Sequence, residues 1–289
     1  MPPDAPPAQP HPFLYLAALR RSGSKLLARA LTSWPRSYVF LEPGIAIPTM
    51  RAKPEPVELL ASLGLDLAAA TRSVQQRPPA DRPRAVVDEI LNPLRRQVPV
   101  VGVKEIRHQA ADAALDALGP DTRVIVLVRD PRGILDSLRR KEAWRDRPIE
   151  LPGGLSPASL ADHLREQFAA QRRMLESRPA CALRYEDLCE RPDLVEAVRR
   201  FCGLPADLDA DLDRLDGHER GARGDRIVTE ATDRWRHDDQ HAAEHADVFR
   251  RLAEECAYWG YDVTGGRTAR PPGPPPGTIT PLFGSSSID

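Results

Sequence analysis

Residues 14–26, LYLAALRRSGSKL, decide the fold of this 289-residue chain. An apolar run typical of a buried β-strand leads into a tight turn of small residues with two arginines, and then into the start of a helix. N–H groups at a helix start, the helix dipole, two hydroxyl groups and nearby cations together favour a phosphate or sulfate group. The alternative interpretation is a plain strand-to-helix turn whose arginines are solvated.

This turn differs from the loop that wraps a nucleoside triphosphate. Nucleotide kinases carry Gly-x-x-x-x-Gly-Lys-Ser/Thr, in which the lysine follows the second glycine and the hydroxyl binds magnesium. Here Ser24 separates Gly23 from Lys25, and no glycine precedes the two arginines. The turn is therefore tighter, and a P-loop phosphotransferase acting on a nucleotide or a small alcohol is only the second enzymatic interpretation.

Short β-rich runs alternate with helical patterns along the rest of the chain. The strand candidates cover residues 13–19, 38–41, 99–104, 123–128 and 181–184. The helix candidates cover residues 24–32, 109–118, 131–141, 156–176, 192–202 and roughly 239–258. Such alternation predicts an α/β fold: a P-loop-like three-layer domain with a central parallel sheet of four or five strands and helices on both faces.

The domain boundaries follow from composition. Residues 1–12 are rich in proline, and residues 265–289 are rich in proline, glycine and serine, so we expect two disordered tails around one domain at 13–264. Two helix-like stretches, 57–70 and 84–96, read as an insertion lying over the edge of the sheet.

A second candidate anion site lies in residues 123–141, RVIVLVRDPRGILDSLRRK. Arg129 follows a predicted strand, and Ser137 comes eight residues later, about two helical turns into the next helix. Both side chains can then face the strand ends, where an arginine fork and a hydroxyl suit a terminal phosphate. The alternative is that Arg129 pairs locally with Asp130 and Ser137 is a small packing residue.

Together these motifs resemble the sulfotransferases that use 3′-phosphoadenosine 5′-phosphosulfate (PAPS). The turn at 21–24 resembles their phosphosulfate loop, and Arg129 with Ser137 resembles their pair for the 3′-phosphate. The resemblance covers residues 13–262 and is strongest to carbohydrate 6-O-sulfotransferases, then to tyrosylprotein sulfotransferases. Further matches are FLEP at 40–43, VGVKEIR at 101–107, LRYEDL at 183–188, FCGL at 201–204, and Trp235 ahead of a final helix that ends at Gly260 and Tyr261.

The resemblance implies that the chain is an enzyme moving a sulfuryl group from PAPS, its co-substrate, to an acceptor hydroxyl, without a metal. Lys25 departs from the family, which usually has Ser or Thr there. Tyr185 packs either against the nucleotide or against the core, and both interpretations stay open. The candidate cofactor-binding residues are Arg20, Arg21, Ser22, Gly23, Ser24, Lys25, Arg129, Ser137 and Tyr185.

The implied catalytic residues are Glu42, Arg21 and Lys104. Glu42 ends the second predicted strand and is the candidate general base, because the acceptor hydroxyl must lose its proton. Lys104 is expected to stabilise charge on the transferring group. The alternatives are a plain turn carboxylate at Glu42, a Lys104 that only pairs with Glu42 or Glu105, and a base at Glu105 or His108.

One rival pattern points to a metal. His241 and His245 with the intervening glutamate resemble a His-x-x-Glu-His zinc motif, and His237 lies four residues earlier, which would place three imidazoles on one helix face. A further ligand for a catalytic site is lacking, so we interpret them as a helix face whose histidines are either solvated or hydrogen-bonded within the protein. The aspartates at 207, 209, 211 and 213 lack the turn and glycine of a calcium loop and read as a charged helix start.

Composition limits the partners. With 41 Lys and Arg against 42 Asp and Glu, the net charge is −1, so the chain carries no bulk charge that would hold nucleic acid or an anionic membrane. The apolar runs are too short to span a membrane, and no secretory signal is evident, which predicts a cytoplasmic protein with reduced cysteines.

The acceptor itself is not encoded in any motif. We expect a small molecule or a glycan, contacted by residues 43–97, 145–157 and 217–235, and the oligomeric state is undetermined. A third interpretation is a protein that binds the nucleotide without turnover.

Overall fold

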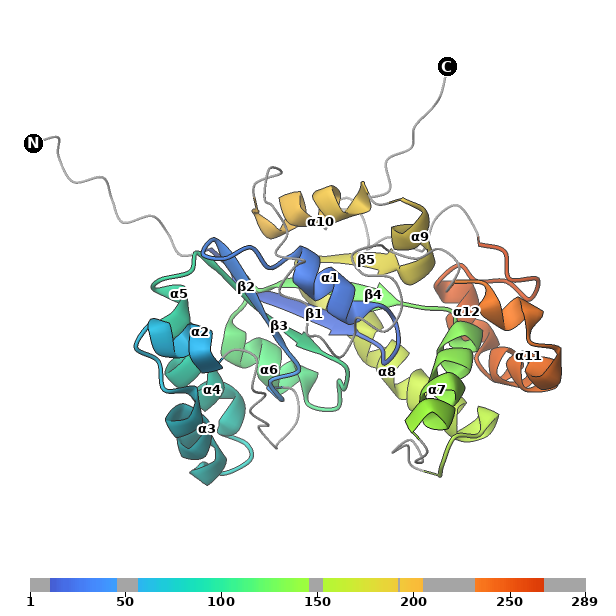
Figure 1. Ribbon diagram of the computed structural model, residues 1–289, viewed down its shortest axis with the longest axis horizontal. Coiled ribbons are helices and arrows are strands. Elements are labelled where there is room, and N and C mark those ends of the chain that lie inside the picture. Colours follow the sequence, from blue (N-terminus) through green and yellow to red (C-terminus); the bar gives the residue numbers. More distant parts are fainter. Residues whose placement is uncertain (1–10, 46–56, 146–152, 192, 205–231, 268–289) are drawn as a thin grey trace, which may run out of the picture.

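The computed structural model describes residues 11–45, 57–145, 153–191, 193–204 and 232–267. Its centre is one parallel five-stranded sheet in the order β2-β3-β1-β4-β5 (Figure 1). All five predicted strands are present, and the predicted α/β three-layer architecture is confirmed. The strands are β1 (Leu14–Ala18), β2 (Ser37–Leu41), β3 (Val100–Glu105), β4 (Arg123–Val128) and β5 (Ala180–Arg184).

The central position of β1 explains where a ligand can approach. All five residues of β1 are buried, as expected for a parallel strand covered on both faces. β1 pairs with β3 on one side and β4 on the other, so the turn after β1 lies between the ends of both neighbours. The chain first leaves β1 towards β2 and β3 and later crosses to β4 and β5. Open α/β sheets bind ligands at such a reversal of strand order.

Helices cover both faces of the sheet. In Figure 1, α1 and α10 lie above the sheet, and α6 and α8 lie below it. Alternate residues of β1 enter two separate cores: Leu14 and Leu16 pack on the α1 side, whereas Tyr15 and Ala17 pack on the α8 side. The covering helices are α1 (Ser24–Ala30), α6 (Ala111–Leu118), α7 (Pro131–Arg145), α8 (Pro157–Ser177), α9 (Tyr185–Glu190) and α10 (Leu194–Cys202).

The insertion between β2 and β3 forms a bundle of short helices. It packs into the α8-side core through buried residues such as Leu60, Val74 and Leu91. The stretch predicted at 57–70 is divided by a turn at Gly64, whose φ of 75° is left-handed. The helices are α2 (Val57–Ser62), α3 (Leu67–Gln76), α4 (Arg82–Val86), a π-helical turn at Val87–Leu91 and α5 (Asn92–Arg95).

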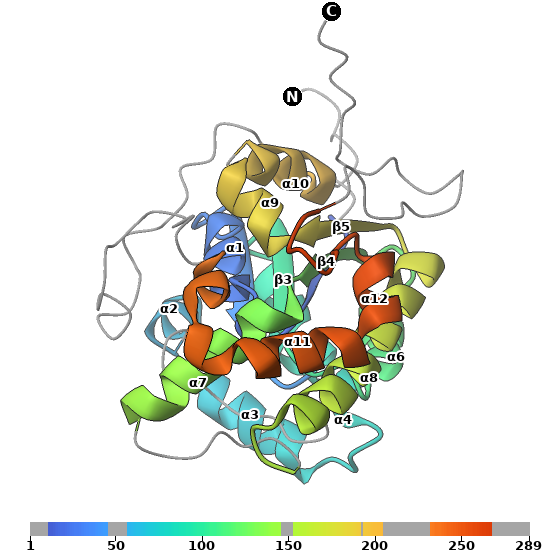
Figure 2. The ribbon, with the colours of Figure 1, turned by 90° about the vertical axis from the view of Figure 1, so that its right-hand side faces the viewer.

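The last predicted helix, 239–258, is wrong as one element. It divides into a 3-10 turn at Asp239–His241, α11 (Ala242–Arg251) and α12 (Ala253–Tyr258). The break falls at Leu252, which is fully buried, and Figure 2 shows α11 and α12 running in different directions. The bend lets Cys256 and Trp259 join the core, so burial overrides the continuous helical pattern.

A C-terminal strap, residues 260–267, follows α12. Tyr261 forms an isolated bridge with Arg267, so ordered contacts run three residues past the predicted domain end at 264. Residues 1–10 and 268–289 of the two predicted tails lie outside the described residues. Among the helices that the structure describes, none is both long and apolar enough to cross a membrane.

Candidate functional site

The turn after β1 has a left-handed backbone. Arg21 has a φ of 63° and Gly23 a φ of 74°, and α1 begins at the next residue. Ser22 is fully buried, and its hydroxyl donates to the Leu19 carbonyl oxygen at 2.7 Å. The Ser22 side chain therefore stabilises the turn itself. Ser24 is also buried, while Lys25 is half-buried in the first turn of α1.

The two candidate anion sites are joined in the structure. The Arg21 Nε donates to Ser137 Oγ at 2.9 Å, across 116 residues of chain. The Arg129 Nη1 donates to the Arg21 carbonyl oxygen at 2.6 Å. Guanidinium and hydroxyl groups from the segments that follow β1 and β4, and from α7, therefore meet at the carboxyl ends of the strands. We call Arg21, Arg129, Ser137 and Tyr185 the arginine cluster.

Tyr185 forms one wall of this cluster. The Arg129 guanidinium lies 4.5 Å from the centroid of the Tyr185 ring, a cation–π distance. Gly23 also packs closely against the Tyr185 ring. A Cβ added at Gly23 would lie 2.4 Å from Tyr185 Cδ2. Burial raises the pKa of Tyr185 to about 12, so its hydroxyl stays protonated. In this structure Tyr185 packs against Arg129 and the turn.

The two arginines of the turn have different surroundings. Arg21 contacts Ser137, whereas Arg20 lies near α8, where its charge helps to lower the pKa of His163 after the larger effect of burial. Arg107, two residues beyond β3, acts on His163 in the same direction. Of the two predicted arginines, the structure brings Arg21 to the second anion site.

The predicted base and the predicted lysine form an ion pair. Lys104 Nζ lies 2.5 Å from Glu42 Oε1, and the Glu42 N–H donates to the Lys104 carbonyl oxygen at 2.7 Å. The Lys104 side chain is 1% exposed and that of Glu42 is 26% exposed, so Glu42 offers the accessible end of the pair. Residues 42–45, which follow β2, are called the Glu42 turn below.

Strain marks the same residues. Among the residues that the structure describes, Arg21 (φ 63°) and Glu42 (φ 54°) are the two that adopt left-handed backbone without being glycine. This conformation is costly for residues with a Cβ and persists where surrounding contacts impose it, frequently at functional sites. One strained residue lies in each of the two predicted parts of the site.

Glu105 and His108, the other candidate bases, are buried. Glu105 is 2% exposed, and its Oε1 accepts the N–H groups of Gly44 and Ile45 at 2.9 Å each. Burial raises the pKa of Glu105 to about 7 and lowers the pKa of His108 to about 4. A neutral, buried His108 is poorly placed to meet an acceptor from solvent.

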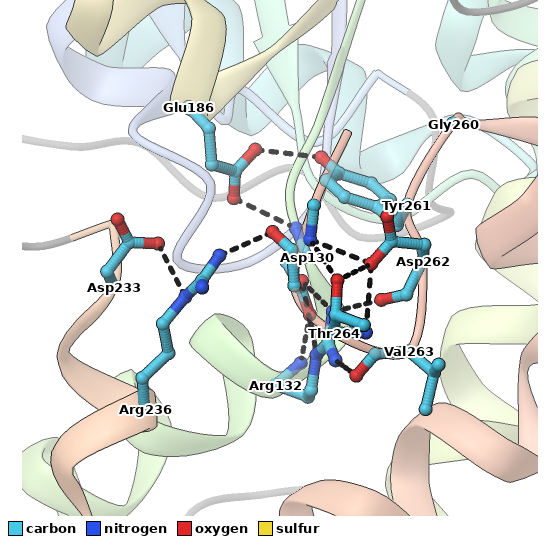
Figure 3. Close-up of polar contacts among 12 residues, drawn as sticks. Asp130, Arg132, Glu186, Asp233, Arg236, Gly260, Tyr261, Asp262, Val263 and Thr264 are labelled. Carbon is cyan, nitrogen blue, oxygen red and sulfur yellow. Dashed lines mark hydrogen bonds and ion pairs between the residues drawn. The ribbon is translucent and has the colours of Figure 1, made fainter. Parts of the chain in front are cut away.

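Figure 3 shows a second polar network, which includes Asp130 and Glu186, the residues that directly follow Arg129 and Tyr185 of the arginine cluster. Glu186 Oε1 accepts the Asp130 N–H at 3.1 Å, and Glu186 Oε2 accepts the Tyr261 hydroxyl at 2.8 Å. Arg132 donates to the Asp130 carboxylate and to the carbonyl oxygens of Asp262 and Val263. The C-terminal strap is thereby attached to the segment that carries Arg129.

The histidine pattern does not form a metal site. His237 lies in a 3-10 turn at Arg234–His237, whereas His241 and His245 lie in later elements, so the expected common helix face is wrong. The His241 Nδ1 lies 2.9 Å from Asp238 Oδ2, so the carboxylate partner of His241 within the protein is Asp238. No group of three or more potential metal ligands occurs among the described residues. The aspartates at 207–213 lie outside those residues.

The family follows from comparison with known proteins. A family model described as "Sulfotransferase family" matches residues 12–208, which is more than half of the chain and includes both anion motifs. The chain belongs to the sulfotransferase family. No curated protein matches it.

One of three similar solved structures, each from a sulfotransferase, supports a shared fold. The sulfotransferase domain from the curacin biosynthetic pathway is 16% identical with a TM-score of 0.51, covering 84% of this chain and 97% of that one. The sulfotransferase domain of the olefin synthase of Synechococcus is 21% identical with a TM-score of 0.46, covering 86% and 96%. A sulfotransferase from Alicyclobacillus acidocaldarius is 17% identical with a TM-score of 0.45, covering 84% and 95%.

Three residues that surround the site escaped sequence analysis. Gly133 lets the Arg129 side chain pass, since an added Cβ would lie 3.0 Å from Arg129 Nε. Glu186 and Tyr261 meet only through the fold. The Tyr-Glu-Asp run at 185–187 and the Gly-Tyr pair at 260–261 were visible as family matches, but nothing in either run shows that they contact each other.

Proposed function

We propose that this member of the sulfotransferase family moves the sulfuryl group of PAPS to a hydroxyl group of a small molecule or a carbohydrate. One observation carries the proposal: the hydrogen bonds that join Arg21 to Ser137 and Arg129 to Arg21 bring both predicted anion motifs to one strand edge. A donor with two separate phosphate-bearing positions requires two such motifs at a short distance.

The arginine cluster is proposed to hold the 3′-phosphate of the donor. Arg129 supplies a guanidinium whose side chain is supported by Tyr185, and Ser137 supplies a hydroxyl. Charge-assisted bonds to phosphate are stronger than neutral ones, and the guanidinium fork fixes the orientation of the phosphate. The turn at residues 20–25 is proposed to hold the phosphosulfate, with Arg21 between the two groups.

Glu42 is proposed as the general base, because it combines a carboxylate with access to solvent. The acceptor oxygen attacks sulfur in line while Glu42 takes the hydroxyl proton. The bond between sulfur and the bridging oxygen breaks, and adenosine 3′,5′-bisphosphate leaves with that electron pair. The products are a sulfate ester and the bisphosphate, with one proton released to solvent when Glu42 ionises again.

The ion pair between Lys104 and Glu42 links the proton transfer to the charge that develops on the leaving oxygen. When Glu42 takes the proton it loses its negative charge, and the buried ammonium of Lys104 then lacks its counter-charge. At the same moment negative charge grows on the leaving oxygen near the turn after β1, which neighbours β3. Preorganised positive charge of this kind stabilises a transition state without reorganisation.

A nucleotide-binding comparison with a transfer assay tests the proposal. We expect adenosine 3′,5′-bisphosphate to raise the melting temperature far more than ADP or ATP, because a 100-fold affinity difference corresponds to about 2.7 kcal/mol at saturation. We also expect label from ³⁵S-PAPS to reach at least one acceptor in a panel of 4-nitrophenol, 2-naphthol, N-acetylglucosamine and chitobiose.

Equal stabilisation by the three nucleotides would overturn the donor assignment. Strong stabilisation by ATP together with an absolute requirement for magnesium would favour the phosphotransferase interpretation. Tight binding of the bisphosphate, with no transfer and no hydrolysis of PAPS, would indicate a binding protein without turnover.

A further inference from the structure

Glu105 is a buried carboxylate to which the proposed reaction assigns no role. It is the last residue of β3 and follows Lys104 directly. Successive residues of a strand point to opposite faces, so Lys104 lies on the α1 side and Glu105 on the α8 side of the sheet. A carboxylate buried in this core must have partners that repay its desolvation.

Its partners are main-chain groups of the Glu42 turn. Gly44 N and Ile45 N both donate to Glu105 Oε1 at 2.9 Å, and Gly44 and Ile45 are themselves buried. The left-handed backbone of Glu42 turns the chain over the carboxyl edge of the sheet. This turn is what carries residues 44 and 45 from the end of β2 to the face where Glu105 lies.

Glu42 is therefore fixed on both sides. Before the turn, its N–H completes the ladder with the Lys104 carbonyl oxygen at 2.7 Å. After the turn, the two bonds to Glu105 hold the chain down. Without them, the Glu42 turn would lose two of the bonds that oppose relaxation of a backbone conformation that residues other than glycine avoid.

We propose that Glu105 is a positioning residue: it holds the main chain of Gly44 and Ile45, and thereby keeps the Glu42 carboxylate beside Lys104 and turned towards the acceptor. The catalytic consequence rests on the proposed function, in which Glu42 is the base. The anchoring itself does not depend on what the protein binds.

The charge state of Glu105 provides a handle on this contact. Its pKa is raised to about 7, chiefly by burial, and the two N–H bonds act in the opposite direction. Titratable groups face it from three strands: the neutral Tyr15 hydroxyl of β1, and the charged Glu42 after β2 and Lys104 of β3. An ionised carboxylate is the stronger acceptor for the two N–H groups, so the contact should strengthen as pH rises through this value.

NMR on the complete protein tests the anchoring without any substrate. We expect the amide proton signals of Gly44 and Ile45 to move with an apparent pKa near 7 between about pH 5.5 and 8.5, and to stop moving in Glu105→Gln. Glu186→Gln is the matched control, because Glu186 is equally buried with a pKa also raised to about 7 but lies behind the arginine cluster. It should leave the movement intact. Gly44 and Ile45 signals that move alike in Glu105→Gln, or that keep their wild-type positions in that variant throughout the pH range, would overturn the proposal.

A double-mutant cycle tests the catalytic consequence, using whichever panel compound accepts the label. We expect Glu105→Ala to lower kcat about 10- to 100-fold with the KM for PAPS within about twofold, and Glu105→Gln to fall between it and the wild type without a pH step near 7. In a Glu42→Gln background, Glu105→Ala should lower kcat by less than about twofold, because the positioned group is already gone.

The outcomes separate the two proposals. If the double variant lowers kcat by the product of the two single effects of Glu42→Gln and Glu105→Ala, Glu105 has no positioning role. A wild-type kcat in Glu105→Ala would lead to the same conclusion. A wild-type protein that transfers no label, but whose Gly44 and Ile45 signals titrate as described, would contradict the proposed function and leave the anchoring standing. Melting curves of each variant separate loss of the turn from loss of the fold.

Discussion

The two parts of the candidate site are built in different ways. The arginine cluster joins residues from four segments, and its bonds bridge more than a hundred positions of the chain, as from Arg21 to Ser137. The Glu42 turn depends on two neighbouring strands, with one ion pair to Lys104 and one carboxylate, Glu105, behind it. The arginine cluster is held by hydrogen bonds between its own members, whereas the Glu42 turn is held by contacts with Lys104 before it and Glu105 after it. Donor binding and turnover should therefore respond to different substitutions.

The largest expected effect concerns Glu42. Glu42→Gln keeps the shape of the side chain and an oxygen for Lys104 but cannot accept a proton. We expect kcat to fall about 10²- to 10⁴-fold, which is the usual contribution of a general base. Affinity for adenosine 3′,5′-bisphosphate, measured by calorimetry on the same preparation, should change by less than about twofold. A variant that retains more than about a tenth of wild-type turnover would contradict the base assignment.

The next effect tests the other part. Arg129→Ala should weaken binding of the bisphosphate by about 2 to 4 kcal/mol, because a charge-assisted fork is lost. Arg129→Lys is the matched control: it keeps the charge, loses the planar fork and should recover only part of the affinity. Titration calorimetry measures both. Binding equal to that of the wild type in a normally melting Arg129→Ala protein would leave Arg129 as a packing residue.

A smaller effect comes from Gly23. Gly23→Ala combines a left-handed φ of 74° with a Cβ placed 2.4 Å from Tyr185. Gly64→Ala is a control with a φ of 75° and no neighbour within 4 Å, so it isolates the backbone cost of about 1 to 2 kcal/mol. Denaturant unfolding should show Gly23→Ala losing about 1 to 3 kcal/mol more than the control. Nucleotide affinity should fall only in Gly23→Ala, and equal affinities in the two variants would separate Tyr185 from the nucleotide site.

The smallest expected effect is on the pH dependence of the free energy of unfolding, and here the Glu42 turn and the network behind the arginine cluster should behave alike. Glu105 and Glu186 have pKa values raised from 4.5 to about 7, chiefly by burial. Between these values the folded protein keeps protons that the unfolded chain has lost, so each residue lowers the free energy of unfolding as pH rises from 4.5 to 7. His108, with its pKa lowered to about 4, contributes the opposite slope.

Difference measurements remove the histidine contribution. The free energy of unfolding of the wild type, minus that of Glu105→Gln or Glu186→Gln, should fall by about 1 to 3 kcal/mol between pH 4.5 and 7 and stay level above. Urea unfolding at a series of pH values gives this difference. A difference that rises with pH, or that is flat for one variant only, would show that the two buried carboxylates are not equivalent in charge state.

Sequence alone predicts the sheet and the residues that face its edge, because both depend on local patterns. Parallel strands buried on both faces are nearly continuous apolar runs, as in residues 123–128, and polar side chains that follow such runs must meet at the carboxyl edge. The arginines, Ser137 and Glu42 were found on this basis. Their roles in PAPS chemistry stay predictions.

What sequence analysis missed depends on contacts between distant segments. Glu186 becomes a buried acceptor only because Tyr261 closes over it, and Gly133 matters only because the Arg129 side chain passes it. The break at Leu252 has the same origin, since the helical pattern continues there and only the buried surroundings of the side chain stop it. Glu105 was considered as a base, but its two main-chain partners could not be inferred from spacing.

The attachment of the C-terminal strap has a consequence for biosynthesis. The residues of the Glu42 turn and its supports, Lys104 and Glu105, have all been synthesised once translation passes Glu105. The network behind Arg129, by contrast, needs Tyr261 and the carbonyl oxygens of Asp262 and Val263, which are synthesised more than 150 residues later than Glu105. A nascent chain can thus hold the Glu42 turn long before it can complete the arginine cluster's support. Translation separates the two parts of the site in time, and a chain can have both only after Val263 has been added.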